Sequence, residues 1–186
     1  MLRNADAFFW ISNLRKRDAY QYSHAINCSL LAVALGRHMG FAESVLMNLA
    51  TGGLLLDIGK SEIPQEMLDN PEPLSRTEMV MMRRHVAFSM HIVESSGVHN
   101  LDVMSMISSH HERHDGSGYP GRLCRNQIPL FGRMAAVIDS YDAMTSHRPY
   151  RKVMSAHKAL QEIYRQRDVL YQSDIVEQFM QCLSVY

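Results

Sequence analysis

Six histidine and aspartate residues have the side-chain types and the positions that a metal centre requires. They are His24, Asp57, His85, His110, His111 and Asp139. Imidazole and carboxylate ligands together suit manganese, iron or zinc better than calcium or magnesium. A carboxylate can also bridge two ions, and a pair of ions stabilises both the attacking and the leaving oxygen in phosphoester cleavage. The six residues therefore predict a divalent-metal centre for hydrolysis, with one or two ions per chain.

Each of these residues also has an ordinary structural interpretation. A single inward-facing histidine, such as His24 or His85, is more often a hydrogen-bonded core residue than a ligand, and Asp57 can satisfy backbone donors at a turn. Asp139 carries more weight, because an unpaired buried carboxylate is costly and tends to find a cation. The metal interpretation rests on the agreement of all six, and above all on the adjacent pair His110 and His111.

Helical periodicity runs through almost the whole chain, with no convincing alternating pattern of a strand. His24, Cys28, Leu31 and Leu35 recur at steps of four, three and four, which places them on one face of a helix over residues 18–38. Further helices are predicted over residues 43–56, 75–97, 101–111 and 130–145, followed by two final helices. The sequence thus predicts an all-α single domain of six to eight helices.

Capping signals mark several of the predicted helix ends. Ser75 opens a capping box, and Ser155 and Asp174 are typical N-caps for the two final helices. Gly59 is a natural left-handed cap after the helix over residues 43–56. These ends place Asp57 just beyond one helix and the histidine pair at the end of another.

Composition narrows the class of protein. The 186 residues are 46% hydrophobic and 20% charged, and 19 basic residues balance 19 acidic ones, so no net charge favours nucleic acid or an anionic membrane. Three cysteines without a CxxC pair indicate a reducing compartment. The sequence shows neither a signal peptide nor an apolar run of membrane-span length. We expect a cytoplasmic domain over residues 18–186, with residues 1–17 as a linker or interdomain helix in a longer parent protein.

One long motif carries a family resemblance. Residues 110–120, His-His-Glu-Arg-His-Asp-Gly-Ser-Gly-Tyr-Pro, resemble the signature of HD-GYP domains, a branch of the HD metal-dependent phosphohydrolase superfamily. The similarity extends to residues 55–60 (LLDIGK), 128–130 (IPL), 136–146 (AVIDSYDAMTS) and 148–151 (RPYR). It implies an HD-type helical bundle with cyclic di-GMP phosphodiesterase activity, giving pGpG or GMP, and with iron or manganese. It also implies bacterial signalling, a fused sensory or regulatory domain and, through it, protein partners.

The resemblance also implies roles for single residues. Asp57 would bridge two ions, with His85, His110 and His111 completing one site and His24 and Asp139 serving the other. Lys60 would approach the scissile phosphate and stabilise developing negative charge. Tyr119 and Asp142 would contact the nucleotide. Arg148 and Arg151 would hold phosphate oxygens or guanine, although their spacing alone is equally typical of a solvated face.

The chain departs from the family pattern at three positions. Leu56 stands where the HD motif has histidine, Tyr20 stands where members with three metals have a carboxylate, and His147 replaces an aspartate. Leu56 keeps a second hypothesis open, in which the domain is a nucleotide receptor or interaction module without turnover. A third hypothesis, an HD hydrolase for another phosphoester, is disfavoured by the Gly-Tyr-Pro loop.

Overall fold

The computed structural model describes residues 18–147 and 153–184, and this part of the chain is built from helices without a named strand. In chain order the helices are α2 (Ala19–His38), α3 (Glu43–Leu55), the 3-10 helix η1 (Ile58–Glu62), α4 (Gln65–Leu68), α5 (Arg76–Arg83), α6 (His85–Ser95), α7 (Leu101–Ser109), the 3-10 helix η2 (Arg125–Gln127), α8 (Leu130–Thr145), α9 (Ala156–Arg165) and α10 (Ser173–Ser184). The all-α prediction is confirmed. Residues 1–17, Arg148 and Arg151 lie outside the described residues.

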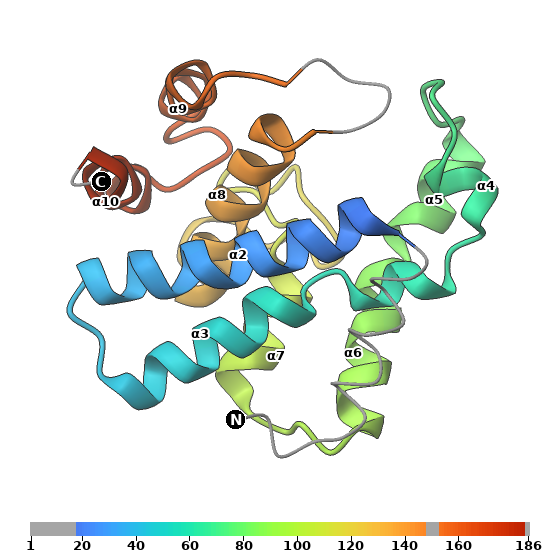
Figure 1. Cartoon of the computed structure of the whole chain (residues 1–186), viewed down its shortest axis with the longest axis horizontal. Coiled ribbons are helices and arrows are strands. Elements are labelled where there is room, and N and C mark those ends of the chain that lie inside the picture. Colours follow the sequence, from blue (N-terminus) through green and yellow to red (C-terminus); the bar gives the residue numbers. More distant parts are fainter. Residues whose placement is uncertain (1–17, 148–152, 185–186) are drawn as a thin grey trace.

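The central helices α2, α3, α7 and α8 pack on one another and hold the main core. Figure 1 shows α4, α5 and α6 on one side of this group, with α9 and α10 on the opposite side, next to α8. Burial of apolar side chains, the dominant favourable contribution to folding, is concentrated where these helices cross. A second, smaller apolar cluster joins α3, α6 and α7 through residues such as Leu55, Val93 and Ile107. The site residues sit between the two clusters.

Helix α2 begins close to its predicted start, next to Asp18. The Asp18 carboxylate accepts a hydrogen bond from the backbone N–H of Gln21 at 3.0 Å, which satisfies a donor that the first turn leaves free. His24, Cys28 and Leu35 are buried on one face, as their spacing predicts. The helix therefore presents the His24 imidazole to the centre of the bundle from a buried face that is mostly apolar.

The predicted helix over residues 75–97 is in fact two helices. The capping box at Ser75 is present, but α5 ends at Arg83 and α6 begins at His85. The imidazole of His85 contacts the Met82 carbonyl at 2.7 Å, and the backbone N–H of Arg84 bonds to carbonyls of α5 in a tighter turn. The break places His85 at the start of a helix, pointing toward the site.

Two predicted helix ends are wrong. Asp174 lies inside the first turn of α10, which begins at Ser173. Gly59 is not a left-handed cap, because the glycines with positive φ are at other positions and Gly59 belongs to η1. Glycine is needed at position 59 because a Cβ there would lie 2.2 Å from the carbonyl oxygen of His85 and 2.3 Å from the backbone nitrogen of Ser89. The close approach of η1 to α6 brings Asp57 next to His85.

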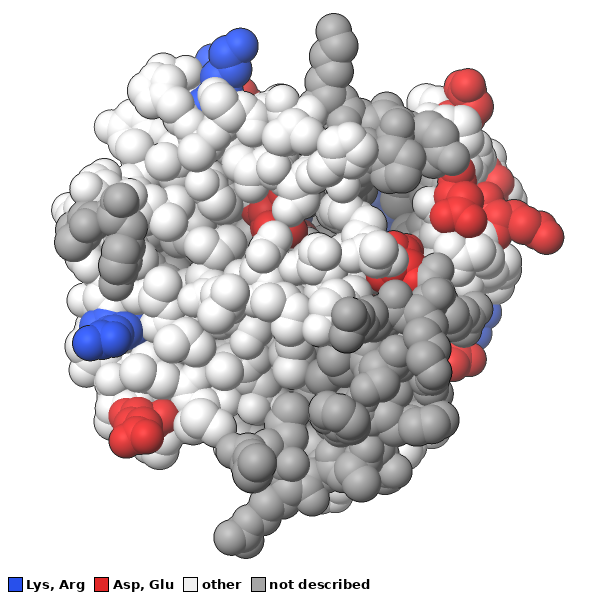
Figure 2. Space-filling model, in the orientation of Figure 1, with Lys and Arg blue, Asp and Glu red and all other residues white. Residues whose placement is uncertain are grey.

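The charged surface agrees with the balanced composition. On the face drawn in Figure 2, the described basic and acidic side chains are scattered, without a broad basic area. None of the described helices combines the length and the apolar character that a bilayer crossing needs.

The contact between η1 and α6 can be tested with Gly59→Ala. The added methyl group meets backbone atoms that cannot rotate away, so the variant should lose about 1–3 kcal/mol of unfolding free energy, as overpacked cores do. Urea denaturation of the metal-free protein measures the loss. Gly97→Asn is the matched control, because Gly97 has φ of +77° and a Cβ added there would have no neighbour within 4 Å, and asparagine tolerates that conformation. Equal stability of Gly59→Ala and the wild type would contradict the close approach.

Candidate active site

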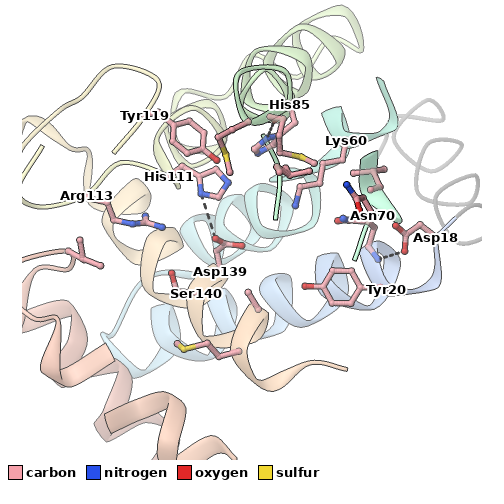
Figure 3. A pocket seen from close by; sticks show the side chains of 18 of the residues that line it. Asp18, Tyr20, Lys60, Asn70, His85, His111, Arg113, Tyr119, Asp139 and Ser140 are labelled. Carbon is pink, nitrogen blue, oxygen red and sulfur yellow. Dashed lines mark hydrogen bonds and ion pairs between the residues drawn. The ribbon is translucent and has the colours of Figure 1, made fainter. Parts of the chain in front are cut away.

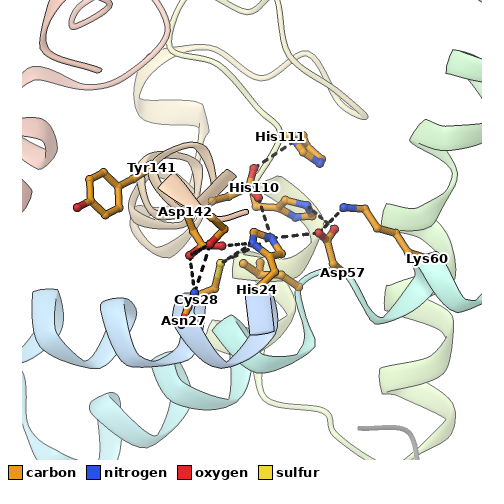
Figure 4. A network of polar contacts seen from close by, with 12 residues as sticks. His24, Asn27, Cys28, Asp57, Lys60, His110, His111, Tyr141 and Asp142 are labelled. Atoms are coloured by element: carbon orange, nitrogen blue, oxygen red, sulfur yellow. Dashed lines mark hydrogen bonds and ion pairs between the residues drawn. The ribbon is translucent and has the colours of Figure 1, made fainter. Parts of the chain in front are cut away.

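The structure brings the six predicted ligands together from five separate segments (Figure 4). His24 comes from α2, Asp57 from the junction of α3 and η1, and His85 from the first position of α6. The pair His110–His111 follows the end of α7, and Asp139 lies in the middle of α8. Figure 4 shows the carboxylate of Asp57 between His24 on one side and Lys60 on the other.

Asp57 is the centre of this arrangement. Its Oδ1 atom lies 3.1 Å from Nε2 of His85 and 3.6 Å from Nε2 of His110. Its Oδ2 atom lies 3.3 Å from Nε2 of His24 and 2.5 Å from Nζ of Lys60. Burial alone would raise the pKa of Asp57, but the charge of Lys60 and the hydrogen bonds of the histidines hold it well below its usual value. The carboxylate is therefore ionised. Its Oδ2 atom faces Lys60 and His24, whereas its Oδ1 atom faces the Nε2 atoms of His85 and His110.

The imidazoles of His85 and His110 are oriented by the backbone. Nδ1 of His85 lies 2.7 Å from the Met82 carbonyl and Nδ1 of His110 lies 2.7 Å from the Ile107 carbonyl, so each Nδ1 carries the proton. The two Nε2 atoms then present lone pairs at a separation of 3.4 Å. This arrangement of metal-binding histidines, with a backbone carbonyl behind each ring, is common in metal sites.

The residues around Asp57 Oδ1 pass a test of fit for a cation. This oxygen is buried without a hydrogen-bond partner, although an unpaired buried carboxylate oxygen is costly. Ligand atoms of Asp57, His85, His110 and His111 all lie within 4.8 Å of one another. Burial and the neighbouring His110 lower the pKa of His111 well below its usual value, so this ring is neutral, as a metal ligand must be. The donor set fits a divalent ion.

A second group of candidate metal ligands meets at His24. Its Nε2 atom lies 3.3 Å from Oδ2 of Asp57 and 3.2 Å from Oδ1 of Asp139. Burial alone would lower the pKa of the His24 imidazole, but its hydrogen bonds to three carboxylates raise it well above its usual value. A cation bound between these carboxylates would take the place of that proton.

Asp142 does not lie where the sequence interpretation placed it. Its carboxylate is buried behind His24 and does not line the cleft, so the structure gives no support to a contact with the nucleotide. Oδ2 lies 2.6 Å from Nδ1 of His24, and Oδ1 accepts hydrogen bonds from Asn27 and Ser146, each at 2.8 Å. Asp142 therefore fixes the orientation of His24 from behind. In the sequence, the indication that Asp142 lies near His24 was its position one turn after Asp139 on α8.

Because position 56 is leucine, the second group of candidate metal ligands has three members, His24, Asp57 and Asp139. The Leu56 side chain is 2% exposed and packs in the main apolar cluster, while its carbonyl accepts a hydrogen bond from Ser89. Cys28 lies 3.7 Å from both ring nitrogens of His24, but burial raises the pKa of its thiol to about 11, so it is a neutral core residue. The missing imidazole is not replaced by a neighbouring charged ligand among the described residues.

Three of the candidate metal ligands, His85, His111 and Asp139, line a cleft of about 810 Å³ (Figure 3). Lys60 also lines it, and Tyr119 stacks on His111 with ring centroids 4.6 Å apart. Burial and the nearby carboxylates raise the pKa of Tyr119, so its phenol stays protonated. The cleft therefore combines a cationic and an aromatic side chain at the entrance to the metal ligands.

Glu112 and Arg113 have structural roles that the sequence interpretation missed. The Glu112 carboxylate, 1% exposed, accepts hydrogen bonds from the backbone N–H groups of Gly121 at 2.6 Å and Leu123 at 3.0 Å, and so shapes the Gly-Tyr-Pro loop. Nη1 of Arg113 donates to the carbonyls of His110 and Glu112. In the sequence, the only indication of these two roles was that both residues lie inside the motif of residues 110–120.

Comparisons with known proteins agree with this geometry. A family model described as HD domain matches residues 9–175. The chain is 35% identical over 163 residues to a cyclic di-GMP phosphodiesterase of Pseudomonas aeruginosa, covering 88% of this chain and 39% of that protein. It is 34% identical over 165 residues to a cyclic di-GMP phosphodiesterase of Thermotoga maritima, covering 88% of this chain and 45% of that protein. The chain thus spans less than half the length of these curated relatives.

A solved structure shows the same fold. The HDG"Y"P protein from Bdellovibrio bacteriovorus superposes with a TM-score of 0.73 at 17% identity, over 96% of this chain and 60% of that one. The likeness covers nearly the whole of the helical domain, including the helices that carry His24, His85 and Asp139.

The role of Asp142 can be tested with Asp142→Asn. Three donors point at this carboxylate, and an amide offers only one acceptor atom, so His24 should lose its fixed orientation. The affinity for Mn²⁺ should fall by about 10–100-fold, the usual cost of removing such a partner, as measured by calorimetry. Asp102→Asn is the control, because Asp102 accepts a bond from Asn48 away from the cleft. Unchanged Mn²⁺ affinity in Asp142→Asn would refute the assignment.

Proposed function

Because the chain belongs to the HD domain family, in its HD-GYP branch, we propose that it is a metal-dependent phosphodiesterase that hydrolyses cyclic di-GMP. The observation that supports this proposal most directly is the convergence of Asp57, His85, His110 and His111 beside a cleft that His85, His111 and Lys60 line. Two of the curated relatives carry the name of that activity. The expected product is linear pGpG, with further cleavage to GMP.

The proposed cofactor is a divalent ion, iron or manganese. His85, His110, His111 and Asp57 would hold one ion, and His24, Asp139 and Asp57 would hold a second. Such an ion, when bound, acts as a Lewis acid on the phosphate and lowers the pKa of a water. The mixed imidazole and carboxylate set is the observation that favours these metals over calcium and magnesium.

The side chains around the ions would orient the substrate and stabilise its charge. Lys60, held by Asp57, would place an ammonium group beside the scissile phosphate, where fixed positive charge stabilises negative charge that develops in the transition state. Tyr119, stacked on His111, would present its ring and phenol to the nucleotide. Arg148 and Arg151, outside the described residues, remain candidates for the phosphates or guanine.

The proposal also covers the parent protein and the place of the reaction in the cell. The curated relatives are more than twice the length of the matched region, which supports a longer parent protein with a sensory or regulatory domain. Within this proposal, residues 18–186 form the catalytic domain, residues 1–17 lead into it, and the reaction occurs in the cytoplasm.

Turnover of cyclic di-GMP tests the main proposal. Protein prepared anaerobically with Fe²⁺ or Mn²⁺ should convert cyclic di-GMP to pGpG, and His110→Gln should reduce the rate to background because it removes a central ligand. His91→Gln is the matched control, since His91 is an exposed histidine of α6. The proposal fails if the metal-loaded wild type shows no more pGpG by chromatography than His110→Gln.

A second candidate function is a nucleotide receptor without turnover, and the buried leucine at position 56 favours it. In this alternative the group at His24 binds its ion too weakly for catalysis, while the cleft still binds a cyclic dinucleotide.

Leu56→His separates the two candidates. If the receptor interpretation is correct, the wild type should bind about one ion per chain and turn over nothing, and the variant should gain a second ion. Elemental analysis of wild type and variant, purified in parallel, measures the ions, and Leu56→Met controls for disturbance of the apolar core. Two ions in the wild type would remove the basis for the receptor interpretation.

A further inference from the structure

The cleft is larger than metal ligands and a phosphate require, and α9 with the segment that follows it forms one of its walls. Glu162, Ile163 and Gln166 of α9 and its C-terminal end line it, together with Leu170 and Tyr171 from the segment between α9 and α10. None of these residues belongs to the metal-binding groups. In Figure 3, Arg113 and Lys60 lie at opposite sides of the pocket, with His111 and Asp139 between them. A ligand that fills the cleft must extend past the ions toward α9.

This half of the cleft is attached to the histidine motif by the backbone. The N–H of His114 donates to the carbonyl of Leu170 at 3.0 Å, and the N–H of Asp115 donates to the carbonyl of Val169 at 2.9 Å. The guanidinium of Arg113 lies over the ring of Tyr171 at 5.6 Å from its centroid. The α9 side therefore has a fixed position relative to His110 and His111, as a binding wall requires.

The α9 side of the cleft combines an apolar side chain with a carboxylate. Met144 of α8 lines this region, and the fully buried Ile163 belongs to the main apolar cluster. The Glu162 carboxylate, on a side chain that is 39% exposed, accepts hydrogen bonds from Gln166 at 3.3 Å and from Arg165 at 3.1 Å. Each carboxylate oxygen has a further lone pair for a ligand. Arg113 uses only Nη1 in its two backbone bonds, and a guanidinium has five N–H donors in total.

These groups match guanine better than adenine. Guanine presents two adjacent donors, N1–H and the 2-amino group, which a carboxylate accepts as a pair, whereas adenine has an acceptor at N1. The O6 and N7 atoms of guanine are acceptors that arginine binds with two donors. Small-molecule sites commonly pair an apolar wall with a few fixed polar groups.

We propose that Arg113, Met144, Glu162 and Gln166 form a guanine subsite, the α9 subsite, for one base of the substrate. Glu162 accepts from the Watson–Crick edge of the base, Arg113 donates to its O6 and N7 side, and Met144 covers its face. The assignment rests on the proposed function for the identity of the nucleotide. It makes α9, rather than the metal ligands, responsible for the choice between guanine and adenine.

The test compares a nucleotide with a substrate that lacks a base. Glu162→Gln should raise KM for cyclic di-GMP about tenfold or more, the order of discrimination that a bidentate base contact gives. Its amide pairs with the N1 and 6-amino groups of adenine, so the preference should shift toward cyclic di-AMP. Hydrolysis of bis(4-nitrophenyl) phosphate by the Mn²⁺-loaded protein should not change. Glu177→Gln, an exposed residue of α10 outside the cleft, is the matched control.

Each alternative result has a definite meaning. Equal loss with both substrates would overturn the subsite, because it would show a general disturbance of the site, and an unchanged KM would overturn it as well. If the wild type cleaves bis(4-nitrophenyl) phosphate but not cyclic di-GMP, the proposed function fails. The subsite is then judged by calorimetric binding of cyclic di-GMP and cyclic di-AMP to the same variants. A tenfold weaker affinity of Glu162→Gln for cyclic di-GMP alone would support it, and equal affinities would overturn it.

Discussion

The ionised carboxylate of Asp57 is the interaction on which the rest of the site depends. It is buried, and its two oxygens face imidazoles from α2, α6 and the end of α7 as well as the ammonium of Lys60. A buried charge is tolerated only when it is paired and hydrogen-bonded. The helices are therefore arranged so that their polar residues meet at this one point, while the apolar faces on either side pack into two separate clusters.

The parts of the fold that sequence predicts well are those that depend on local patterns. The face of α2 and the capping box at Ser75 follow from helical spacing and local hydrogen bonds, and the structure contains both. Gly59 could not be understood in this way, because the backbone it approaches belongs to α6, about thirty residues later. The break before His85 likewise depends on where that imidazole must point. Contacts between distant segments are not encoded in local periodicity.

In the site as well, the sequence indicated which residues take part better than it indicated what each of them contacts. Composition and position singled out His24, Asp57 and Asp139, and the structure brings both carboxylates within hydrogen-bonding range of His24. The contact of Asp142 with His24 was not foreseen, because motif position does not reveal which side chains a carboxylate meets inside the fold. Its neighbours Asn27 and Ser146 are donors that only a three-dimensional arrangement brings to the carboxylate.

The attachment of the C-terminal helices to the motif loop has an evolutionary consequence. The two bonds that join Val169 and Leu170 to the loop are made by backbone atoms, which every residue type except proline can supply on the donor side. Side chains on the cleft-facing side of α9 can therefore be exchanged without loosening the proposed metal ligands. If the α9 subsite selects the base as proposed, a lineage of such domains can acquire a new nucleotide preference by substitutions in one helix.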